Sequence, residues 1–232
     1  MVIGDGLIAR GFSEYATNDR VVIFASGVSN SANTDITAFD REQKLLERAL
    51  ANNKEHKFIY FSTCSIYDPS LQHSAYVRHK IAMEDIIANT HKDYLIFRIS
   101  NLAGKTDNPH TVFNFFIQHI LSGNPFHVWK RATRNIIDIS DALSICRYII
   151  NNDLYQNERV NIANPSNYSV PEIVETIEHY FGKKGNYTIL DRESNPVIDI
   201  HSIKKIISDL AINFDGNYLE KTIKKYFPIN DL

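Results

Sequence analysis

The apolar positions of the chain form short continuous runs that alternate with segments of helical periodicity. Such runs are typical of strands that are buried on both faces of a sheet. Between them, residues 38–52 and 76–89 repeat apolar side chains along one helical face. Alternating strands and helices of this kind predict an α/β fold with a parallel sheet covered by helices on both faces. The predominantly apolar runs are residues 1–3, 21–25, 58–61 and 94–99.

A glycine-containing turn joins the first predicted strand to the first predicted helix. Its sequence, Gly4-x-Gly6-x-x-Ala9, has the spacing of a turn that binds a dinucleotide. In such turns the backbone approaches a pyrophosphate at the N-terminus of the helix. The acidic residue that usually contacts the ribose is missing, because the next strand ends in Ala25-Ser-Gly27. A plain strand-to-helix turn is the alternative interpretation.

Hydroxyl groups follow directly on the apolar run at residues 58–61. Thr63 stands at the end of this strand, Tyr76 comes thirteen residues later, and Lys80 four residues after that. If a helix begins near Tyr76, then Tyr76 and Lys80 share one face, about one turn apart. A nearby ammonium favours phenolate and lowers the pKa of a tyrosine from about 10. Tyr76 is therefore a candidate general acid/base, and a helix start with a solvated lysine is the alternative.

Composition argues against several classes of protein. The 232 residues are 44% hydrophobic and carry a net charge of −2, which is typical of a globular protein and gives no support to a broad nucleic-acid or membrane footprint. Cys64 and Cys146 have no disulfide or ligand spacing, and His73 and His79 lack metal-ligand spacing. No signal peptide or membrane-length apolar run is visible. We expect a cytoplasmic protein with no metal, no membrane and no nucleic acid as a partner.

With both motifs in place, the chain resembles the extended short-chain dehydrogenase/reductase superfamily. Within it, the chain is most similar to the NAD-dependent epimerase/dehydratase family, which acts on nucleotide sugars. Residues 61–67 resemble the family's Ser-Ser-x-x-Val-Tyr strand end, and Tyr76 with Lys80 match its Tyr-x-x-x-Lys motif. Further matches follow in the family's order, at residues 19–25, 98–104, 134–141 and 160–173.

The resemblance implies roles for individual residues. Thr63, Tyr76 and Lys80 would form the catalytic triad, with Thr63 also contacting substrate and the other two also contacting cofactor. Asn101 lies in a segment that resembles Arg-x-x-Asn-x-x-Gly, whose asparagine contacts substrate. Arg134 lies in one that resembles Arg-Asp-x-Ile-x-Val-x-Asp, whose arginine binds the nucleotide diphosphate. The alternatives are a solvated arginine on a hairpin for Arg134 and a turn-forming residue after a strand for Asn101.

NAD or NADP is the cofactor that the resemblance implies. Arg10 directly follows the glycine turn and could meet the 2′-phosphate of NADP, or it could be a surface residue of the helix. Besides Tyr76 and Lys80, the implied cofactor contacts are Gly4, Gly6, Leu7, Ile8, Arg10, Ala25, Ser26 and Gly27.

The chain departs from the family between its first two strands. The family usually has two more strands and a helix there, whereas only residues 13–18 fill the interval here. Removing strands 2 and 3 from the order 3-2-1-4-5-6-7 leaves strand 1 at the edge, beside strand 4, and a short right-handed crossover can join them. We therefore expect a Rossmann-like parallel sheet that lacks the usual second and third strands, with a small C-terminal α+β substrate lobe. Residues 1–105 plus about 135–165 would form the first domain, and about 106–134 and 166–232 the lobe.

The implied reaction is hydride transfer at a sugar carbon. Tyr76 would take the hydroxyl proton, Lys80 would hold the nicotinamide ribose, and Thr63 would align the substrate. Dehydratases of the family carry an Asp-Glu pair directly after the catalytic threonine, where Cys64 and Ser65 stand here. These residues cannot supply the proton donor and base of an elimination, so a ketoreductase or an epimerase is favoured. Cys64 could do other acid–base work or be a small buried residue.

A different class of function stays open. The missing strands would also suit a non-catalytic or weakly catalytic nucleotide-binding scaffold of the same fold, although the intact triad argues against it. By resemblance, the helices at residues 38–52 and 76–89 would pair in a homodimer, and a second subunit could complete the adenosine pocket.

Overall fold

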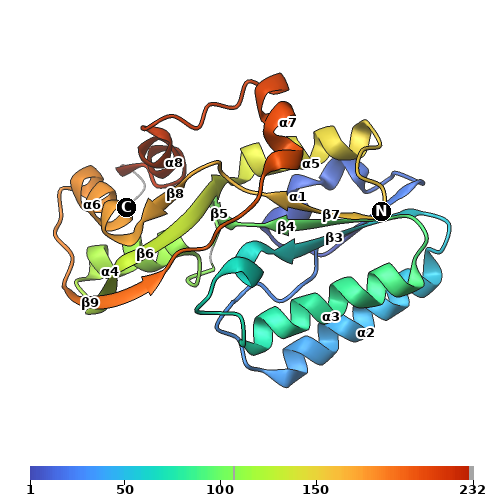
Figure 1. Ribbon diagram of the computed structural model, residues 1–232, viewed down its shortest axis with the longest axis horizontal. Helices are drawn as coiled ribbons and strands as arrows, with labels where there is room; N and C mark the ends of the chain where they lie inside the picture. The colour runs from blue at the N-terminus through green and yellow to red at the C-terminus, as the bar shows by residue number, and fades with distance from the viewer. Residues whose placement is uncertain (107, 230–232) are drawn as a thin grey trace.

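A computed structural model describes residues 1–106 and 108–229 and has the predicted α/β architecture (Figure 1). Residues 107 and 230–232, which fall in the expected lobe, lie outside the described residues. The main sheet has five parallel strands in the order β1-β2-β3-β4-β7. They span Val2–Ile3, Val21–Phe24, Lys57–Thr63, Tyr94–Ile99 and Glu158–Ile162. The strands β2, β3 and β4 are almost wholly buried, which explains their continuous apolar sequence.

Helices cover both faces of this sheet, and the side chains of each strand alternate between the two faces. On one face, α2 (Ile36–Asn52) and α3 (Ala75–Thr90) pack on Val22 and Phe24 of β2 (Figure 1). Ile23 of the same strand faces the opposite layer, as strand geometry requires. That layer contains α1 (Leu7–Gly11), α5 (Ile139–Asn151) and α7 (Lys204–Asp209).

The short connection between the first two strands is confirmed. Between β1 and β2 the chain forms only α1 and the 3-10 helix η1 (Ser13–Tyr15). Within the described residues β1 pairs with β2 alone, so it is an edge strand. The turn after β1 requires glycine, because Gly4 has φ +124° and a Cβ there would lie 2.4 Å from the carbonyl oxygen of Ala25. The turn therefore lies directly against the end of β2.

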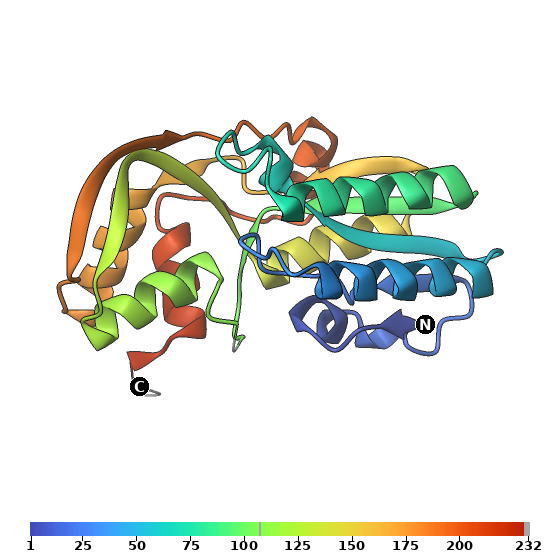
Figure 2. The ribbon, with the colours of Figure 1, turned by 90° about the horizontal axis from the view of Figure 1, so that it is seen from below.

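A second sheet follows in the chain, built around the long strand β6 (Phe126–Asp138). This strand pairs with β5 (Asn101–Ala103), β8 (Asn167–Ser169) and β9 (Tyr187–Ser194). Figure 2 shows β6 and β9 arching over helices that share a separate apolar core with them. These helices are α4 (Val112–Ser122), α6 (Val170–Phe181) and α8 (Tyr218–Tyr226).

One segment that we expected in the lobe packs on the main sheet instead. Ile200, Ile203 and Ile206 join the core formed by α5 and the main sheet. They belong to the 3-10 helix η3 (His201–Ile203) and its flanks, including α7. These isoleucines supply apolar cover that the sequence pattern of the lobe did not reveal. The other domain boundaries stay a prediction. Among the described residues, no helix has both the length and the hydropathy to span a bilayer.

Candidate active site

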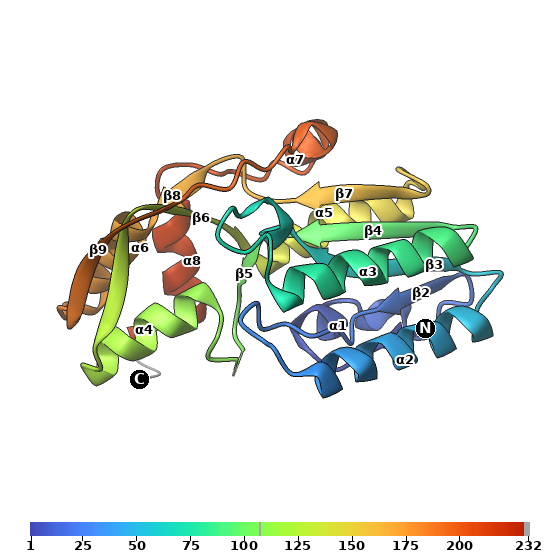
Figure 3. The ribbon, with the colours of Figure 1, turned by 60° about the horizontal axis from the view of Figure 1, so that its bottom comes forward.

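A cavity of about 630 Å³ lies where the parallel strands end and the second sheet begins. Figure 3 shows β3, β4 and β7 pointing their carboxyl ends toward the second sheet. In open α/β sheets, ligands bind at these ends of the strands. The cavity walls come from the segments that follow β1, β2, β3 and β4, together with side chains of the second sheet.

The three predicted catalytic residues line this one cavity. Thr63 is the last residue of β3. The side chain of Ser74 caps α3 by accepting a hydrogen bond from the Val77 amide, which places Tyr76 and Lys80 in the first turns of that helix. All three residues are buried, with exposed fractions of 6% for Thr63, 6% for Tyr76 and 3% for Lys80. Residues that the sequence places in two separate elements therefore converge, as their spacing suggested.

Thr63 is held in place by its neighbour in the next turn. Its hydroxyl accepts a hydrogen bond from the Ser65 amide at 3.0 Å and lies 2.9 Å from the Ser65 hydroxyl. Ser65 belongs to the 3-10 helix η2 (Cys64–Tyr67), so this turn fixes the threonine side chain. A threonine fixed in this way keeps one orientation toward the cavity.

Lys80 has protein partners that the sequence analysis missed. Its ammonium donates to Glu42 Oε1 at 3.0 Å, to the Tyr60 hydroxyl at 3.1 Å and to the Phe61 carbonyl oxygen at 3.4 Å. Glu42 is completely buried on α2. One signal was present in the sequence, because Glu42 lies four residues before Leu46 on the apolar face of its helix.

The surroundings of Glu42 keep its carboxylate ionised. Burial by itself would raise the pKa of Glu42, but Lys80 and hydrogen bonds from His79, Tyr60 and the Val28 amide together lower it to about 2. Burial and the neighbouring Glu42 raise the pKa of Tyr60, so this phenol stays protonated and donates to the carboxylate. The result is a buried ion pair with a satisfied set of hydrogen bonds.

The predicted cofactor residues divide into two groups. Gly4 shapes the turn but is not part of the cavity wall, and Arg10 donates to the Asp5 carbonyl oxygen at 3.1 Å on the exposed surface. Arg10 therefore gives no structural support to the NADP interpretation. A Cβ added at Gly6 would meet no atom within 4 Å, so the backbone is open there. The predicted residues that line the cavity are Gly6, Leu7, Ile8, Ala25, Ser26 and Gly27.

Two serines add polar groups to the cavity wall. The hydroxyls of Ser62 and Ser100 are buried and have no hydrogen-bond partner among the described residues. Both residues line the cavity, at the ends of β3 and β4. Buried hydroxyls are normally paired, so these two suit a ligand with polar groups. With the open backbone at Gly6, they fit the nicotinamide and pyrophosphate part of a dinucleotide.

The opposite wall carries the predicted substrate residues. Asn101 donates from Nδ2 to the Asn135 carbonyl oxygen at 2.8 Å, and both residues line the cavity. The Arg134 guanidinium lies 5.6 Å from the centre of the Trp129 ring, and its Nη1 is 3.7 Å from Asp68 Oδ2. Burial lowers the pKa of Arg134, and Asp68 opposes this effect. This wall therefore offers a cation, an aromatic ring and amides to a ligand.

Trp129 and Asp68 were not predicted as site residues. Trp129 also has the guanidinium of Arg192 5.3 Å from its ring centre, so two arginines flank the indole. Asp68 is buried and accepts hydrogen bonds from Ser70 and Ser194. The sequence signal for Trp129 was its place five residues before Arg134, while Asp68 had no clear signal.

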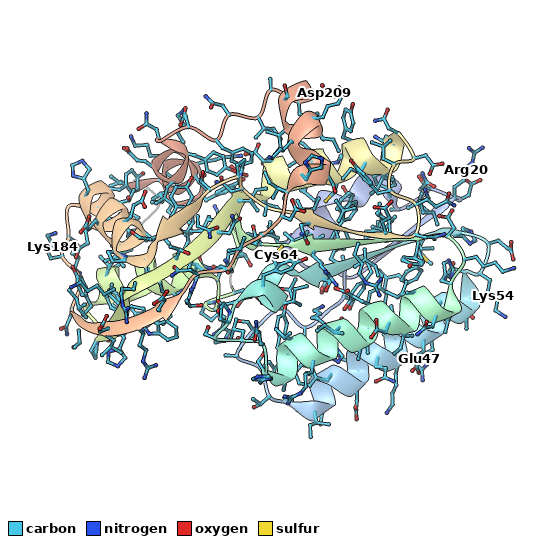
Figure 4. The ribbon with its side chains drawn as sticks, viewed as in Figure 1. Arg20, Glu47, Lys54, Cys64, Lys184 and Asp209 are labelled. Carbon is cyan, nitrogen blue, oxygen red and sulfur yellow. The ribbon has the colours of Figure 1, made fainter. Side chains whose placement is uncertain are left out.

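Cys64 lines the cavity, but its surroundings do not support a role for it as a base. Its thiol donates to the Arg98 carbonyl oxygen at 3.1 Å, and it is buried at the end of β3, near the centre of the molecule in Figure 4. Burial raises the pKa of the Cys64 thiol well above its usual range, so the thiol stays protonated. This agrees with the alternative that Cys64 is a small buried residue at a strand end.

Comparison with known proteins adds a family match. The family model described as "NAD dependent epimerase/dehydratase family" matches residues 7–163. The search of curated proteins finds no match to this chain.

Several solved structures share the fold. The dTDP-glucose 4,6-dehydratase of Bacillus anthracis, in complex with NAD, has a TM-score of 0.70 and 16% identity, over 98% of this chain and 79% of that chain. The UDP-glucuronic acid 4-epimerase of Bacillus cereus, with UDP-glucuronic acid and NAD, has a TM-score of 0.70 and 21% identity, over 94% and 78%. The UDP-glucose 4-epimerase of Thermus thermophilus, in complex with NAD, has a TM-score of 0.69 and 14% identity, over 95% of this chain and 81% of that chain. At these identities the likeness concerns the fold.

Proposed function

Because the chain belongs to the NAD dependent epimerase/dehydratase family, a family of enzymes, we propose that it is a nucleotide-sugar ketoreductase or epimerase. Tyr76 is its proposed general acid/base. The observation that carries this proposal is the convergence of Thr63, Tyr76 and Lys80 in one cavity, whose opposite wall carries Arg134 and Trp129. Separate binding walls next to an acid–base group are what a two-substrate reaction of this kind needs.

NAD or NADP is the proposed cofactor. When bound, it would accept a hydride from the sugar carbon and could return it. The similar structures from three organisms contain NAD. In this chain the open backbone at Gly6 and the unpaired hydroxyls of Ser62 and Ser100 support binding of its polar groups. The cavity-lining residues 6–8 and 25–27 are the further proposed contacts.

The chain's own residues transfer the proton and orient the substrate. The phenolic oxygen of Tyr76 takes the proton from the sugar hydroxyl at the carbon that loses hydride, and returns it in the reverse direction. Thr63, fixed by Ser65, aligns that hydroxyl. Thr63 and Tyr76 have little exposure to bulk solvent, which strengthens the hydrogen bonds that align the substrate.

A nucleotide sugar suits the chemistry of the opposite wall. Planar guanidinium groups make paired hydrogen bonds to phosphate oxygens, and Arg134 is the proposed group here. The indole of Trp129 offers a flat face for the base, and Asn101 offers an amide for sugar hydroxyls. Elimination of water at the sugar is disfavoured, because a Cys64 thiol that stays protonated cannot serve as the base and the Ser65 hydroxyl, which is hydrogen-bonded to Thr63, is a weak acid and a weak base.

The proposal is tested by binding and turnover. Titration of the purified protein with NADH and NADPH, followed by fluorescence, should show saturable binding. With a panel of nucleotide sugars, Tyr76→Phe should lower kcat by at least about 10²-fold while the affinity for the reduced dinucleotide stays within about threefold. Full turnover by Tyr76→Phe would contradict the mechanism. If NAD, NADH, NADP and NADPH all failed to bind at millimolar concentration with nucleotide sugars present, the proposal of an enzyme would be contradicted.

A nucleotide-binding scaffold is the second candidate. It is favoured by the edge position of β1 and by the protein partners that already satisfy Lys80. A scaffold would bind a nucleotide sugar at the cavity wall that carries Arg134, without turning it over.

Cytoplasmic location and a homodimeric state remain predictions of the sequence.

A further inference from the structure

The ammonium of Lys80 is fully satisfied by the protein. A lysine ammonium has three donors, and Lys80 has three acceptors, on Glu42, Tyr60 and Phe61. The contact to the Phe61 carbonyl oxygen is the longest, at 3.4 Å, against 3.0 Å for Glu42. The lysine therefore has a defined position before any ligand enters the cavity.

Glu42 gathers partners from three separate parts of the fold. Its Oε2 accepts from the Val28 amide at 2.7 Å and lies 3.0 Å from His79 Nε2. Its Oε1 accepts from the Tyr60 hydroxyl at 2.7 Å and from Lys80. The loop after β2, strand β3 and helix α3 are thus joined through one carboxylate on α2.

The ion pair presents only its lysine to the cavity. Lys80 lines the cavity, whereas Glu42 is not part of the wall and has no exposed surface. Gly27 covers the pair, since a Cβ at Gly27 would lie 2.5 Å from Lys80 Nζ and 2.9 Å from Glu42 Oε1. A ligand at Gly27 therefore meets a lysine whose position and charge balance are set by a residue it cannot touch.

We propose that Glu42 is the positioning residue of Lys80. Its carboxylate fixes the ammonium beneath Gly27 and balances its charge. A hydroxyl of the cofactor then needs to replace only the long contact to Phe61, while the contacts to Glu42 and Tyr60 keep the lysine in place. Preset groups bind more tightly because less freedom is lost on binding. The inference rests on the proposed function, because it assumes a dinucleotide at this wall.

Glu42→Gln tests the proposal, because it keeps the shape of the side chain and removes the charge. Glu47→Gln is the matched control, since Glu47 lies on the exposed side of the same helix (Figure 4). We expect the Kd for NADH to rise about tenfold in Glu42→Gln and to stay within about twofold in Glu47→Gln. The KM for the dinucleotide should rise with it, whereas the KM for the nucleotide sugar should not.

A double-mutant cycle separates positioning from general damage to the fold. In a Lys80→Met background, Glu42→Gln should change the Kd for NADH by less than about twofold, because Glu42 acts through the lysine. Glu42→Asp keeps the charge and should weaken binding less than Glu42→Gln does, which also serves if the glutamine variant does not fold. Equal losses in both backgrounds, or equal binding by Glu42→Gln and Glu47→Gln, would overturn the inference alone. A wild-type chain that binds no dinucleotide would overturn the proposed function and this inference with it.

Discussion

At the scale of single residues, the candidate site depends on a buried pair of opposite charges. Glu42 and Lys80 form a buried ion pair with an N–O distance of 3.0 Å, and both side chains are at most 3% exposed. Taking two charges out of water is costly, and removing one partner leaves the other uncompensated. The surrounding donors from Val28, Tyr60 and His79 make the arrangement tolerable by satisfying the carboxylate.

Acid should weaken the fold through Glu42. Its pKa falls from 4.5 to about 2 on folding, so its stabilisation is present above pH 4.5 and is lost as pH falls toward 2. A shift of this size is worth on the order of 3 kcal/mol. Urea unfolding at several pH values should therefore give Glu42→Gln a much lower free energy of unfolding than wild type at pH 7. The difference between the two free energies should shrink as the pH falls toward 2. Glu47→Gln should follow wild type throughout, and a gap for Glu42→Gln that does not change with pH would contradict the assignment.

Gly27→Ala should affect both activity and stability. The added methyl would lie 2.5 Å from Lys80 Nζ and 2.9 Å from Glu42 Oε1, so the buried ion pair would have to shift. We expect a loss in unfolding free energy of about 1–3 kcal/mol and a fall in kcat/KM of more than about tenfold. Gly216→Ala is the control, because a Cβ there meets nothing within 4 Å. Wild-type turnover by Gly27→Ala would show that the position of Lys80 does not matter.

At the scale of elements, the short link between β1 and β2 shapes the cofactor site. It holds only α1 and η1, and in the described part of the chain no strand lies beyond β1. The helix α1 has five residues, so it provides only a short macrodipole for a pyrophosphate. The second half of a dinucleotide therefore finds few contacts on this chain.

Weak discrimination between NADH and NADPH follows from that link. The strand β2 ends in Ala25-Ser-Gly27, without an acidic residue that would exclude a 2′-phosphate, and Arg10 is bonded to the Asp5 carbonyl oxygen. Fluorescence titrations should give Kd values for NADH and NADPH within about threefold of each other. Arg10→Ala should leave the ratio unchanged. A difference of more than about a hundredfold between the two Kd values would show that other residues recognise the adenosine part of the dinucleotide.

At the scale of the whole molecule, the helix layers on the two faces of the main sheet differ: other segments of the chain cover part of one layer, while the other layer lies on the outside. The segment around η3 and α7 covers part of the face formed by α5, whereas α2 and α3 lie on the outside of the molecule (Figure 1). Ile36 on α2 and Ile81 on α3 are exposed, with exposed fractions of 71% and 39%. These two positions lie on the helices that the family resemblance places at a dimer interface.

Dimerisation through α2 and α3 is the expected outcome. Sedimentation should show a dimer for wild type, and Ile81→Glu should shift it toward monomer, because a charge would be buried in the interface. Ile189→Glu, at a 60% exposed position on β9, should leave the dimer intact. A monomeric wild type would exclude this interface, and with it the completion of the adenosine site by a second subunit.

The sequence by itself determined the architecture and identified the candidate catalytic residues. Continuous apolar runs specify buried parallel strands because each strand is covered on both faces, and these patterns are local. The convergence of Thr63, Tyr76 and Lys80 followed because residues at the carboxyl ends of parallel strands and at the start of the next helix meet at one edge. The resemblance to the family, with only residues 13–18 between the first helix and the next strand, implied that two strands of the family's dinucleotide cradle are missing.

Only the tertiary structure decided the partners of these residues. Glu42 and Lys80 are 38 positions apart, and their contact depends on how α2 and α3 pack on β3. The sequence left two roles open for Arg10, a contact to a 2′-phosphate or a surface position on the helix. In the structure its guanidinium donates to the Asp5 carbonyl oxygen on the exposed surface. Periodicity reports which face of an element is apolar, but not which polar group on another element it will meet. For that reason the sequence identified Lys80 as a candidate catalytic residue, and the fold showed that a buried carboxylate holds it.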